Sequence, residues 1–243
     1  VGVPGPVDSK GVVYKCVNLG WGIFNVNEKL EDLTGISVKA GNDANVAALG
    51  EMWKGGGQGF HTLVVVTLGT GVGGGIILDG QMLTGAKGAG GEIGHITVNH
   101  DEIEACNCGQ YGCLEQYTSA TGIVRLAKRK LAKSSEETSI REIPNLTAKD
   151  VFDAAKAGDT IAIGLVDEVC EILGSTLSNI ACVVNPEIIV IGGGVSKAGD
   201  ILLDNIKKHF VETAFMACRD TKFALAGLGN DAGMYGCVEM LLD

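Results

Sequence analysis

One histidine and three cysteines form the most chemically specific pattern in this sequence. His95 is followed by ten residues and then by Cys106, Cys108 and Cys113, within the run Cys-Asn-Cys-Gly-Gln-Tyr-Gly-Cys. Three thiolates and one imidazole make a complete tetrahedral ligand set for zinc, so no coordination position is left for water or a substrate. The pattern therefore predicts a structural Zn2+, and its loss should loosen the loop 90–115.

Two carboxylates, Glu92 and Glu115, flank this ligand set without belonging to it. Glu92 follows the small residues 88–91, where the backbone can approach a ligand closely. Each residue also has a simpler interpretation. Glu92 could be an ordinary surface residue, and Glu115 could interact with the dipole of a helix that starts there. We predict that both contact a bound ligand held against the metal loop.

Asn42 and Asp43 are the best candidates for catalysis. Asn and Asp are preferred at helix N-termini, so a pure capping role is one interpretation of the pair. Capping is compatible with catalysis, because both require a carboxylate fixed at a helix start. An aspartate beside an alcohol can act as the base in phosphoryl transfer, where positioning dominates the barrier.

Two glycine-rich turns could approach a nucleotide. A turn is predicted over 70–75, so Gly69 immediately precedes it and Thr70 and Gly71 begin it. Its bare amides could hold phosphate oxygens, although a glycine-rich hairpin is the simpler interpretation. The glycines at 192–194 follow an apolar strand and would let a flat ring or a phosphate lie against the backbone. Neither run is a Walker A loop or a dinucleotide fingerprint. Together they suggest one extended nucleotide site.

Strands and helices must bring these residues together. A continuous apolar run at 63–68 indicates a buried strand, and 75–78 a second one. Asn25 and Glu28 predict a capped helix to about Leu33 that ends at Gly35. Further helices are predicted at 44–54, 119–133, 148–157, 160–184, 200–213 and 231–242, and shorter strands at 12–16, 37–40, 187–191 and 222–226. Strands that alternate with helices indicate the α/β class.

Composition excludes several functions. A net charge of −10 argues against a nucleic-acid-binding face, and the one basic run, 125–133, is interpreted as a solvated helix face. No apolar run is long enough to span a membrane, because Asn185-Pro186-Glu187 interrupts the best candidate. Eight cysteines without a secretory signal favour a reducing, cytoplasmic location. Five of them are predicted to be buried thiols: Cys16, Cys170, Cys182, Cys218 and Cys237.

Taken in order along the chain, these motifs resemble the ROK family of sugar kinases (repressors, open reading frames and kinases), most closely its bacterial glucokinases. The metal motif is highly specific, and the glycine motifs support it by their order and spacing. The matching segments cover nearly the whole chain: 3–8, 18–21, 42–45, 69–75, 92–95, 106–115, 191–194 and 229–233.

The resemblance implies an actin-like (hexokinase-type) two-domain ATPase fold with a zinc-bound loop. Residues 1–58 and 230–243 would belong to the small N-terminal domain, and residues 59–229 would form the large domain with the zinc loop and the glycine turns. The glycines at 55–59 would lie near a crossing between the domains, and the sugar would bind between them. The family also implies a homodimer or a larger assembly.

The resemblance assigns a role to each candidate residue. Asp43 would take the proton from the 6-hydroxyl of a hexose as it attacks the γ-phosphate of ATP. His95 would bind zinc through one ring nitrogen and face the sugar with the other. The sugar would contact Asn42, Asp43, Glu92, His95 and Glu115. The ATP phosphates, bridged by Mg2+, would lie at Gly69, Thr70 and Gly71, and the adenosine at Gly192, Gly193 and Gly194.

The sequence departs from the family at its start. Family kinases begin with a strand and turn of the form Asp-x-Gly-Gly-Thr, which handles phosphate and metal, and this sequence lacks it. Because Val1 is not Met and begins what reads as a strand end, we expect an upstream segment that holds this motif and the first strands of the small domain. If residues 1–243 were the whole molecule, we would expect weak or absent kinase activity.

Three functions remain open on the sequence. The leading one is ATP-dependent phosphorylation of a hexose, with glucose as the first candidate. The second is a sugar-sensing transcriptional repressor of the same family, which would carry DNA-binding helices upstream. The third is a zinc-stabilised, sugar-binding fragment with impaired catalysis. The residues before Val1 would discriminate best among them.

Overall fold

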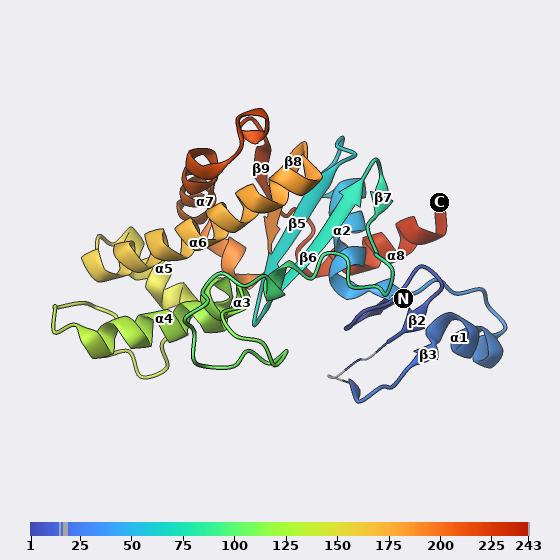
Figure 1. Ribbon diagram of the computed structural model, residues 1–243, viewed down its shortest axis with the longest axis horizontal. Coiled ribbons are helices and arrows are strands. Elements are labelled where there is room, and N and C mark those ends of the chain that lie inside the picture. Colours follow the sequence, from blue (N-terminus) through green and yellow to red (C-terminus); the bar gives the residue numbers. More distant parts are fainter. Residues whose placement is uncertain (15, 17–18, 243) are drawn as a thin grey trace.

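A five-stranded sheet forms the centre of the molecule. The computed structural model describes residues 1–14, 16 and 19–242 (Figure 1). The strand order is β7-β6-β5-β8-β9. The parallel strands are β5 (Leu63–Leu68), β8 (Ile188–Gly192) and β9 (Lys222–Leu225), and β6 (Val72–Leu78) and β7 (Gln81–Met82) extend the sheet in antiparallel fashion. The α/β class predicted from sequence is confirmed.

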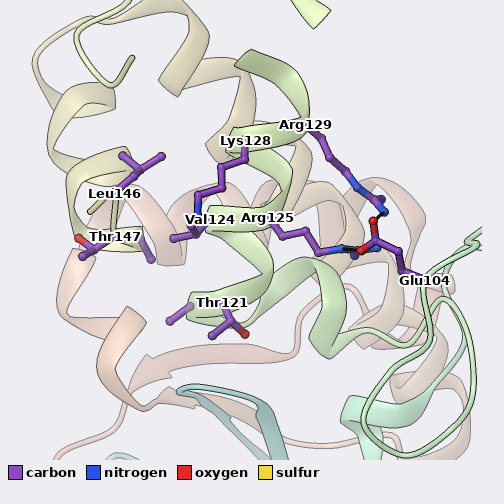
Figure 2. Close-up of a pocket in the computed structure, with 10 residues that line it drawn as sticks. Glu104, Thr121, Val124, Arg125, Lys128, Arg129, Leu146 and Thr147 are labelled. Atoms are coloured by element: carbon purple, nitrogen blue, oxygen red, sulfur yellow. Dashed lines mark hydrogen bonds and ion pairs between the residues drawn. The ribbon is translucent and has the colours of Figure 1, made fainter. Parts of the chain in front are cut away.

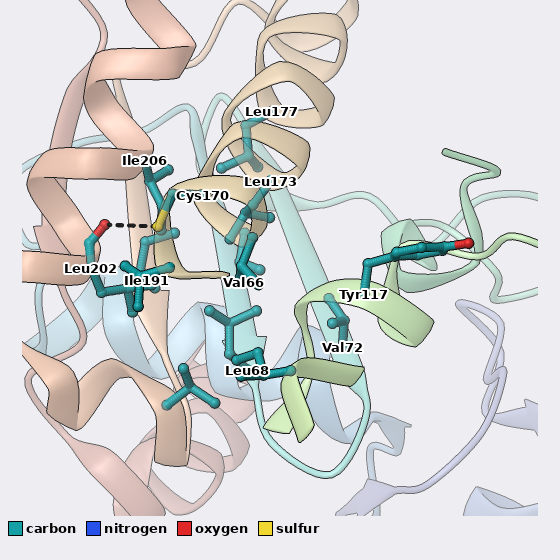
Figure 3. Packing of buried hydrophobic residues seen from close by; sticks show 14 of the residues in the cluster. Val66, Leu68, Val72, Tyr117, Cys170, Leu173, Leu177, Ile191, Leu202 and Ile206 are labelled. Carbon is teal, nitrogen blue, oxygen red and sulfur yellow. Dashed lines mark hydrogen bonds between the residues drawn. The ribbon is translucent and has the colours of Figure 1, made fainter. Parts of the chain in front are cut away.

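One face of this sheet carries the main hydrophobic core. Val64, Val66 and Leu68 point to it from β5, and Leu173 and Leu177 meet them from the long helix α6 (Figure 3). Most of this core comes from the helices α4 (Ala120–Lys133), α5 (Ala148–Lys156), α6 (Thr160–Val184) and α7 (Asp200–Thr213). The core fixes α4 and α5 beside the end of β5, where the first glycine turn begins.

Two helices that are distant in sequence cover the opposite face. The helices α2 (Asp43–Lys54) and α8 (Ala232–Leu242) pack on each other and on the alternate β5 residues Leu63 and Val65. Gly236 makes this contact possible, because a Cβ there would lie 1.7 Å from the carbonyl oxygen of Val46. The sheet therefore holds the N-terminus of α2, and with it Asp43, against the same framework as the core helices.

The first forty residues form a smaller unit with its own apolar cluster around Val7 and Val13. The helix α1 (Val26–Thr34) has Asn25 as its N-cap and ends at Gly35, whose φ is 69°, as the sequence predicted. The remaining strands each have two residues and form two pairs: parallel β1 (Gly2–Val3) with β4 (Gly41–Asn42), and antiparallel β2 (Val12–Val13) with β3 (Phe24–Asn25).

One short helix and several 3-10 turns connect the longer elements. The helix α3 (Glu115–Thr118) follows the metal motif and leads into α4. The 3-10 turns are η2 (Ile93–His95), η3 (Gly194–Ala198), η4 (Met216–Cys218) and η5 (Gly229–Asp231). Between η2 and α3 the metal loop is irregular and its strand-like pairing is limited to isolated bridges, which agrees with the irregular segment expected.

The structure corrects the predicted course of the glycine run. The strand β6 starts at Val72 and not at Gly75, so Gly73 and Gly74 lie in the strand and not in a turn before it. Close packing explains these glycines: a Cβ on Gly74 would lie 2.5 Å from the Gly91 carbonyl oxygen, and one on Gly75 would lie 2.4 Å from Cβ of Ala48. Only residues 69–71 remain as the turn between the strands.

Other predictions were also wrong in detail. Residues 37–40 are not a strand, because the paired segment is Gly41–Asn42. Cys182 is exposed rather than buried. The predicted strand 12–16 and the family segment 18–21 include residues 15 and 18, which lie outside the described residues. The division into two domains stays a prediction. Within the described residues, no helix combines the length and the apolar character needed to cross a bilayer.

Candidate functional site

The structure brings the four predicted metal ligands together. The ligand atoms of His95, Cys106, Cys108 and Cys113 all lie within 4.8 Å of one another. Cys108 Sγ is 3.6 Å from Cys113 Sγ, and Cys106 Sγ is 3.9 Å from His95 Nδ1. A tetrahedral zinc with bonds of about 2.3 Å to sulfur requires sulfur atoms about 3.8 Å apart. The donor set and its spacing therefore fit Zn2+.

Burial and glycine geometry shape this cluster. Cys106 and Cys113 are buried, and Cys108 is exposed. Burial raises the pKa of the Cys106 thiol in the metal-free protein, so zinc must displace a tightly held proton. Gly112 has a φ of 71°, and a Cβ there would lie 1.8 Å from the Asn99 carbonyl oxygen. Only glycine allows the loop to close on itself at this point.

The ring of His95 joins the metal cluster to the carboxylates. Its Nδ1 faces Cys106 and lies 3.9 Å from Glu115 Oε1. Its Nε2 lies on the other side, 4.0 Å from Glu92 Oε2. Cys106 Sγ is also 2.9 Å from Glu115 Oε1. One ring nitrogen thus faces the metal position while the other faces outward to Glu92.

Three carboxylates gather around this ring. Burial raises the pKa of Glu92; His95 lowers it, and the charges of Asp43 and Glu115 raise it further. Asp43 and Glu115 are therefore both near enough to act on the charge of Glu92, although they are 72 positions apart in the sequence. Ionised carboxylates only accept hydrogen bonds, so the group suits a ligand with several hydroxyl donors.

The N-terminus of α2 fixes Asn42 and Asp43. Asn42 Oδ1 accepts hydrogen bonds from the backbone N–H groups of Ala44 (3.0 Å) and Asn45 (3.1 Å), and its Nδ2 donates to the Gly5 carbonyl (3.1 Å). Asp43 Oδ1 accepts from the Ala44 N–H at 2.8 Å. Burial raises the pKa of Asp43, although one side of this residue is open to solvent. Asn42 is thus the cap, and Asp43 has one oxygen to spare.

The first glycine turn is anchored by α4. The Ala120 N–H donates to the Gly69 carbonyl at 2.8 Å, and Thr121 Oγ1 donates to the Thr70 carbonyl at 2.7 Å. Within the turn, the Gly69 N–H donates to the Gly71 carbonyl at 3.0 Å. We call residues 69–71 the phosphate turn, after the phosphate contact that the sequence predicts for them.

The phosphate turn lies directly beside the carboxylate group. A Cβ on Gly71 would be 2.7 Å from Glu115 Oε2, so Gly71 leaves the space that this carboxylate fills. The helix α3 therefore presents Glu115 to the metal cluster with one oxygen and to the phosphate turn with the other.

The second glycine run, 192–194, packs against the residue that precedes the phosphate turn. Gly193 has a φ of 83°, and a Cβ there would lie 2.5 Å from the Leu68 carbonyl oxygen, one residue before the phosphate turn. A pocket of about 300 Å³ opens beside Gly194, between α5 and η3. Its walls are apolar at Phe152 and Val195 and carry three lysines, Lys149, Lys156 and Lys197. The two glycine runs therefore pack against each other at Gly193 and Leu68.

The sequence interpretation missed a charged network on α4. Arg125 and Arg129 lie in the basic run that we interpreted as a solvated face, but both form ion pairs with Glu102 and Glu104 of the metal loop. Figure 2 shows both guanidinium groups turned toward Glu104, at one side of a groove of about 610 Å³. The alternation of basic and apolar residues in the run gave no signal of a partner 21 or more residues earlier.

Asn45 is a second missed residue. It is buried in α2, and its Nδ2 donates to the Gly90 carbonyl at 3.2 Å. This bond ties the helix that carries Asp43 to the segment that leads to Glu92. An asparagine in the first turn of a helix rich in small residues could have drawn notice in the sequence.

Comparison with known proteins agrees with this geometry. A family model described as "ROK family" matches residues 1–243. The glucokinase of Halalkalibacterium halodurans is 49% identical over 241 residues, which cover 97% of this chain and 73% of that protein.

Solved structures agree as well. The ROK family glucokinase from Streptomyces griseus, in complex with glucose and AMPPNP, has a TM-score of 0.84 at 33% identity over 98% of this chain and 79% of that one. A ROK family transcriptional regulator, a homolog of the E. coli MLC protein, has a TM-score of 0.86 at 29% identity, over 96% of this chain and 59% of that one.

Proposed function

Because this chain belongs to the ROK family and is glucokinase-like in sequence, we propose that it phosphorylates a hexose at the 6-hydroxyl with ATP as the donor. Glucose is the first candidate. The observation that carries the proposal is the contact between the sugar-side carboxylate Glu115 and the phosphate turn at Gly71. The same carboxylate neighbours His95 and Glu92, so a hydroxyl-binding group and a phosphate-binding turn meet at one point.

In this proposal Asp43 is the general base. The free oxygen of its carboxylate takes the proton as the O6–H bond breaks. A bond forms between O6 and the γ-phosphorus, the bond from that phosphorus to the bridging oxygen breaks, and ADP leaves with the electron pair. Burial raises the pKa of Asp43, which strengthens its carboxylate as a base. The fixed helix N-terminus holds the carboxylate in place.

The remaining site residues hold the substrates. Glu92, Glu115 and the outward nitrogen of His95 accept or donate hydrogen bonds to the other hydroxyls, with Asn42 beside the base. Zinc would hold His95 and the start of α3 in one orientation, which keeps Glu115 at its distance from the phosphate turn. Its role in this proposal is mechanical support.

ATP would lie along the two glycine runs. Its phosphates would meet the backbone at Gly69, Thr70 and Gly71, where Mg2+ would neutralise phosphate charge. The adenosine would rest on Gly192–Gly194, in the pocket between α5 and η3, whose volume of about 300 Å³ is near the lower limit for small-molecule sites. The lysines at its rim add positive charge for the phosphates.

A coupled assay for ADP release tests the proposal. Zinc-loaded protein is given Mg-ATP and, in turn, glucose, mannose, fructose, N-acetylglucosamine and N-acetylmannosamine. We expect turnover with at least one sugar, and glucose to have the highest kcat/KM. Absence of turnover with every sugar, in protein that binds glucose, would contradict kinase function for this chain.

A second candidate is a sugar-responsive regulator, which the similarity to the transcriptional regulator favours. A regulator needs the carboxylates and His95 to bind the sugar, but it has no need of Asp43 as a base. Calorimetric titration with glucose, with and without AMPPNP, separates the two. A kinase binds both ligands, whereas glucose binding without any nucleotide binding supports the regulator.

A further inference from the structure

A buried glutamate joins the metal loop to the helix behind it. The side chain of Glu102 is only 1% exposed, and it accepts a hydrogen bond from Tyr117 Oη at 2.6 Å. It also accepts from the backbone N–H groups of Ile103 and Glu104, each at 3.0 Å. A buried carboxylate is costly unless it is paired and fully hydrogen-bonded.

Two arginines on α4 supply that pairing. Arg129 holds Glu102 with a two-pronged contact, Nη1 to Oε2 at 2.9 Å and Nη2 to Oε1 at 3.0 Å. Arg125 also pairs with Glu102, and its Nε donates to Glu104 Oε2 at 2.9 Å. The hydrogen bonds from Arg129 hold the pKa of Glu102 far below its usual range, against its burial. Both charges of the pair therefore persist at neutral pH.

The same network reaches α3. Arg125 Nη1 donates to the Gln116 carbonyl at 3.0 Å, and its guanidinium lies over the ring of Tyr117. Gln116 Oε1 in turn accepts from the N–H of the metal ligand Cys113 at 3.0 Å. These contacts fix α3 and therefore Glu115, the first residue of this helix.

The other end of α4 holds the phosphate turn, through Ala120 and Thr121. Thr121 and Arg129 are eight residues apart on one unbroken helix. About 12 Å along the helix axis therefore separates the contact with the phosphate turn from the contact with Glu102. The metal loop and the phosphate turn thus both contact α4, at different positions along this helix.

We propose that Arg129 and Arg125, through Glu102, are positioning residues that set the alignment of Glu115 against the phosphate turn. Neither arginine needs to touch a substrate. The inference rests on the proposed kinase function only for its effect on turnover. Misplacement of reacting groups by about 1 Å can cost about 100-fold in rate. Loss of the network should therefore lower kcat more than it raises either KM.

Hydrogen exchange on zinc-loaded protein tests the coupling without substrate. The variants are Glu102→Gln, Arg129→Gln and Arg129→Lys, the last of which keeps the charge but loses the two-pronged contact. Lys133→Gln is the matched control, because it removes one positive charge from an exposed position on the same helix. We expect at least about tenfold faster exchange in residues 99–106 and also in residues 69–73 for Arg129→Gln, a smaller change for Arg129→Lys, and none for the control.

Faster exchange confined to residues 99–106, or no change in either segment, would overturn the proposal. Should Glu102→Gln fail to fold, the two Arg129 variants still decide the matter, because Arg129 is partly exposed and its replacement is tolerated more easily.

Kinetics supply the second readout. We expect kcat per zinc-loaded molecule to fall about 10- to 100-fold in Arg129→Gln, with both KM values within about twofold. A purely structural role would lower the melting temperature and leave kcat unchanged at 25 °C, and that result also overturns the proposal. If the Arg129 variants show the expected exchange changes but the wild-type protein phosphorylates no sugar, the proposed function fails and the positioning role stands.

Discussion

Replacement of Asp43 by asparagine should remove the proposed base and leave the shape of the site intact. Asp43 uses one oxygen to accept the Ala44 N–H at 2.8 Å, and an asparagine carbonyl can accept the same bond. The neighbouring cap, Asn42, keeps its own hydrogen bonds. The substitution therefore tests proton transfer rather than folding.

The expected loss of kcat is about 10²- to 10⁴-fold, the usual contribution of a general base. This corresponds to about 2.7–5.5 kcal/mol in activation free energy. Sugar affinity should fall by less than about tenfold, since asparagine still accepts or donates one hydrogen bond, with a net value of about 1 kcal/mol. The fold loss in kcat should thus exceed the fold loss in sugar affinity by an order of magnitude or more.

The direction of the pKa shift adds a stability effect. Burial raises the pKa of Asp43 in the folded state, so the folded protein binds this proton more tightly than the unfolded chain. The ionised carboxylate therefore destabilises the fold at every pH above its folded pKa, and this cost disappears below the unfolded pKa. At pH 7 Asp43→Asn should raise the free energy of unfolding, by less than about 1 kcal/mol because the residue is open to solvent.

The assay combines steady-state kinetics, calorimetric titration with glucose and urea unfolding at pH 7. Asp204→Asn is the control, because Asp204 is an exposed aspartate on α7, outside the candidate site. In wild type, kcat should also fall as the pH drops through the raised pKa of Asp43. A kcat for Asp43→Asn within threefold of wild type would refute the role of Asp43 as base.

Three further predictions follow from the site and the core. Removal of zinc by a chelator should weaken glucose binding in calorimetry, and unchanged affinity in folded, metal-free protein would contradict the support role. Gly193→Ala should raise the KM for ATP and lower the melting temperature, since a Cβ there meets the Leu68 carbonyl at 2.5 Å; an unchanged KM would place the adenosine elsewhere. Leu177→Ala should cost about 2–5 kcal/mol in urea unfolding, because Leu177 is fully buried, and a loss below 1 kcal/mol would contradict the packing.

Helix positions were predictable because their signals are local. The helix 160–184 matches α6, and Asn25 with Gly35 matches the ends of α1. Capping depends on residues three or four positions apart, which a sequence displays directly. Strands were harder: 37–40 was wrong because pairing depends on a partner, here residues 2 and 3, that lies far away in the chain.

Glycines show the same limit. The run at 73–75 reads as a turn from its composition, yet it forms a strand, because α2 and the segment before Glu92 pack too closely for any side chain. A glycine that serves close packing cannot be told from a glycine that serves a turn without knowing what lies opposite.

The sequence by itself determined the ligand set His95, Cys106, Cys108 and Cys113, because zinc ligands can be recognised from their residue types and their spacing. It also determined that Asp43 begins a helix. Only the tertiary structure decided that Glu115 lies next to Gly71 and that Arg129 forms an ion pair with Glu102, 27 positions earlier. Such contacts arise when sheet and core packing place distant segments together, and no local pattern encodes which side chains will then meet.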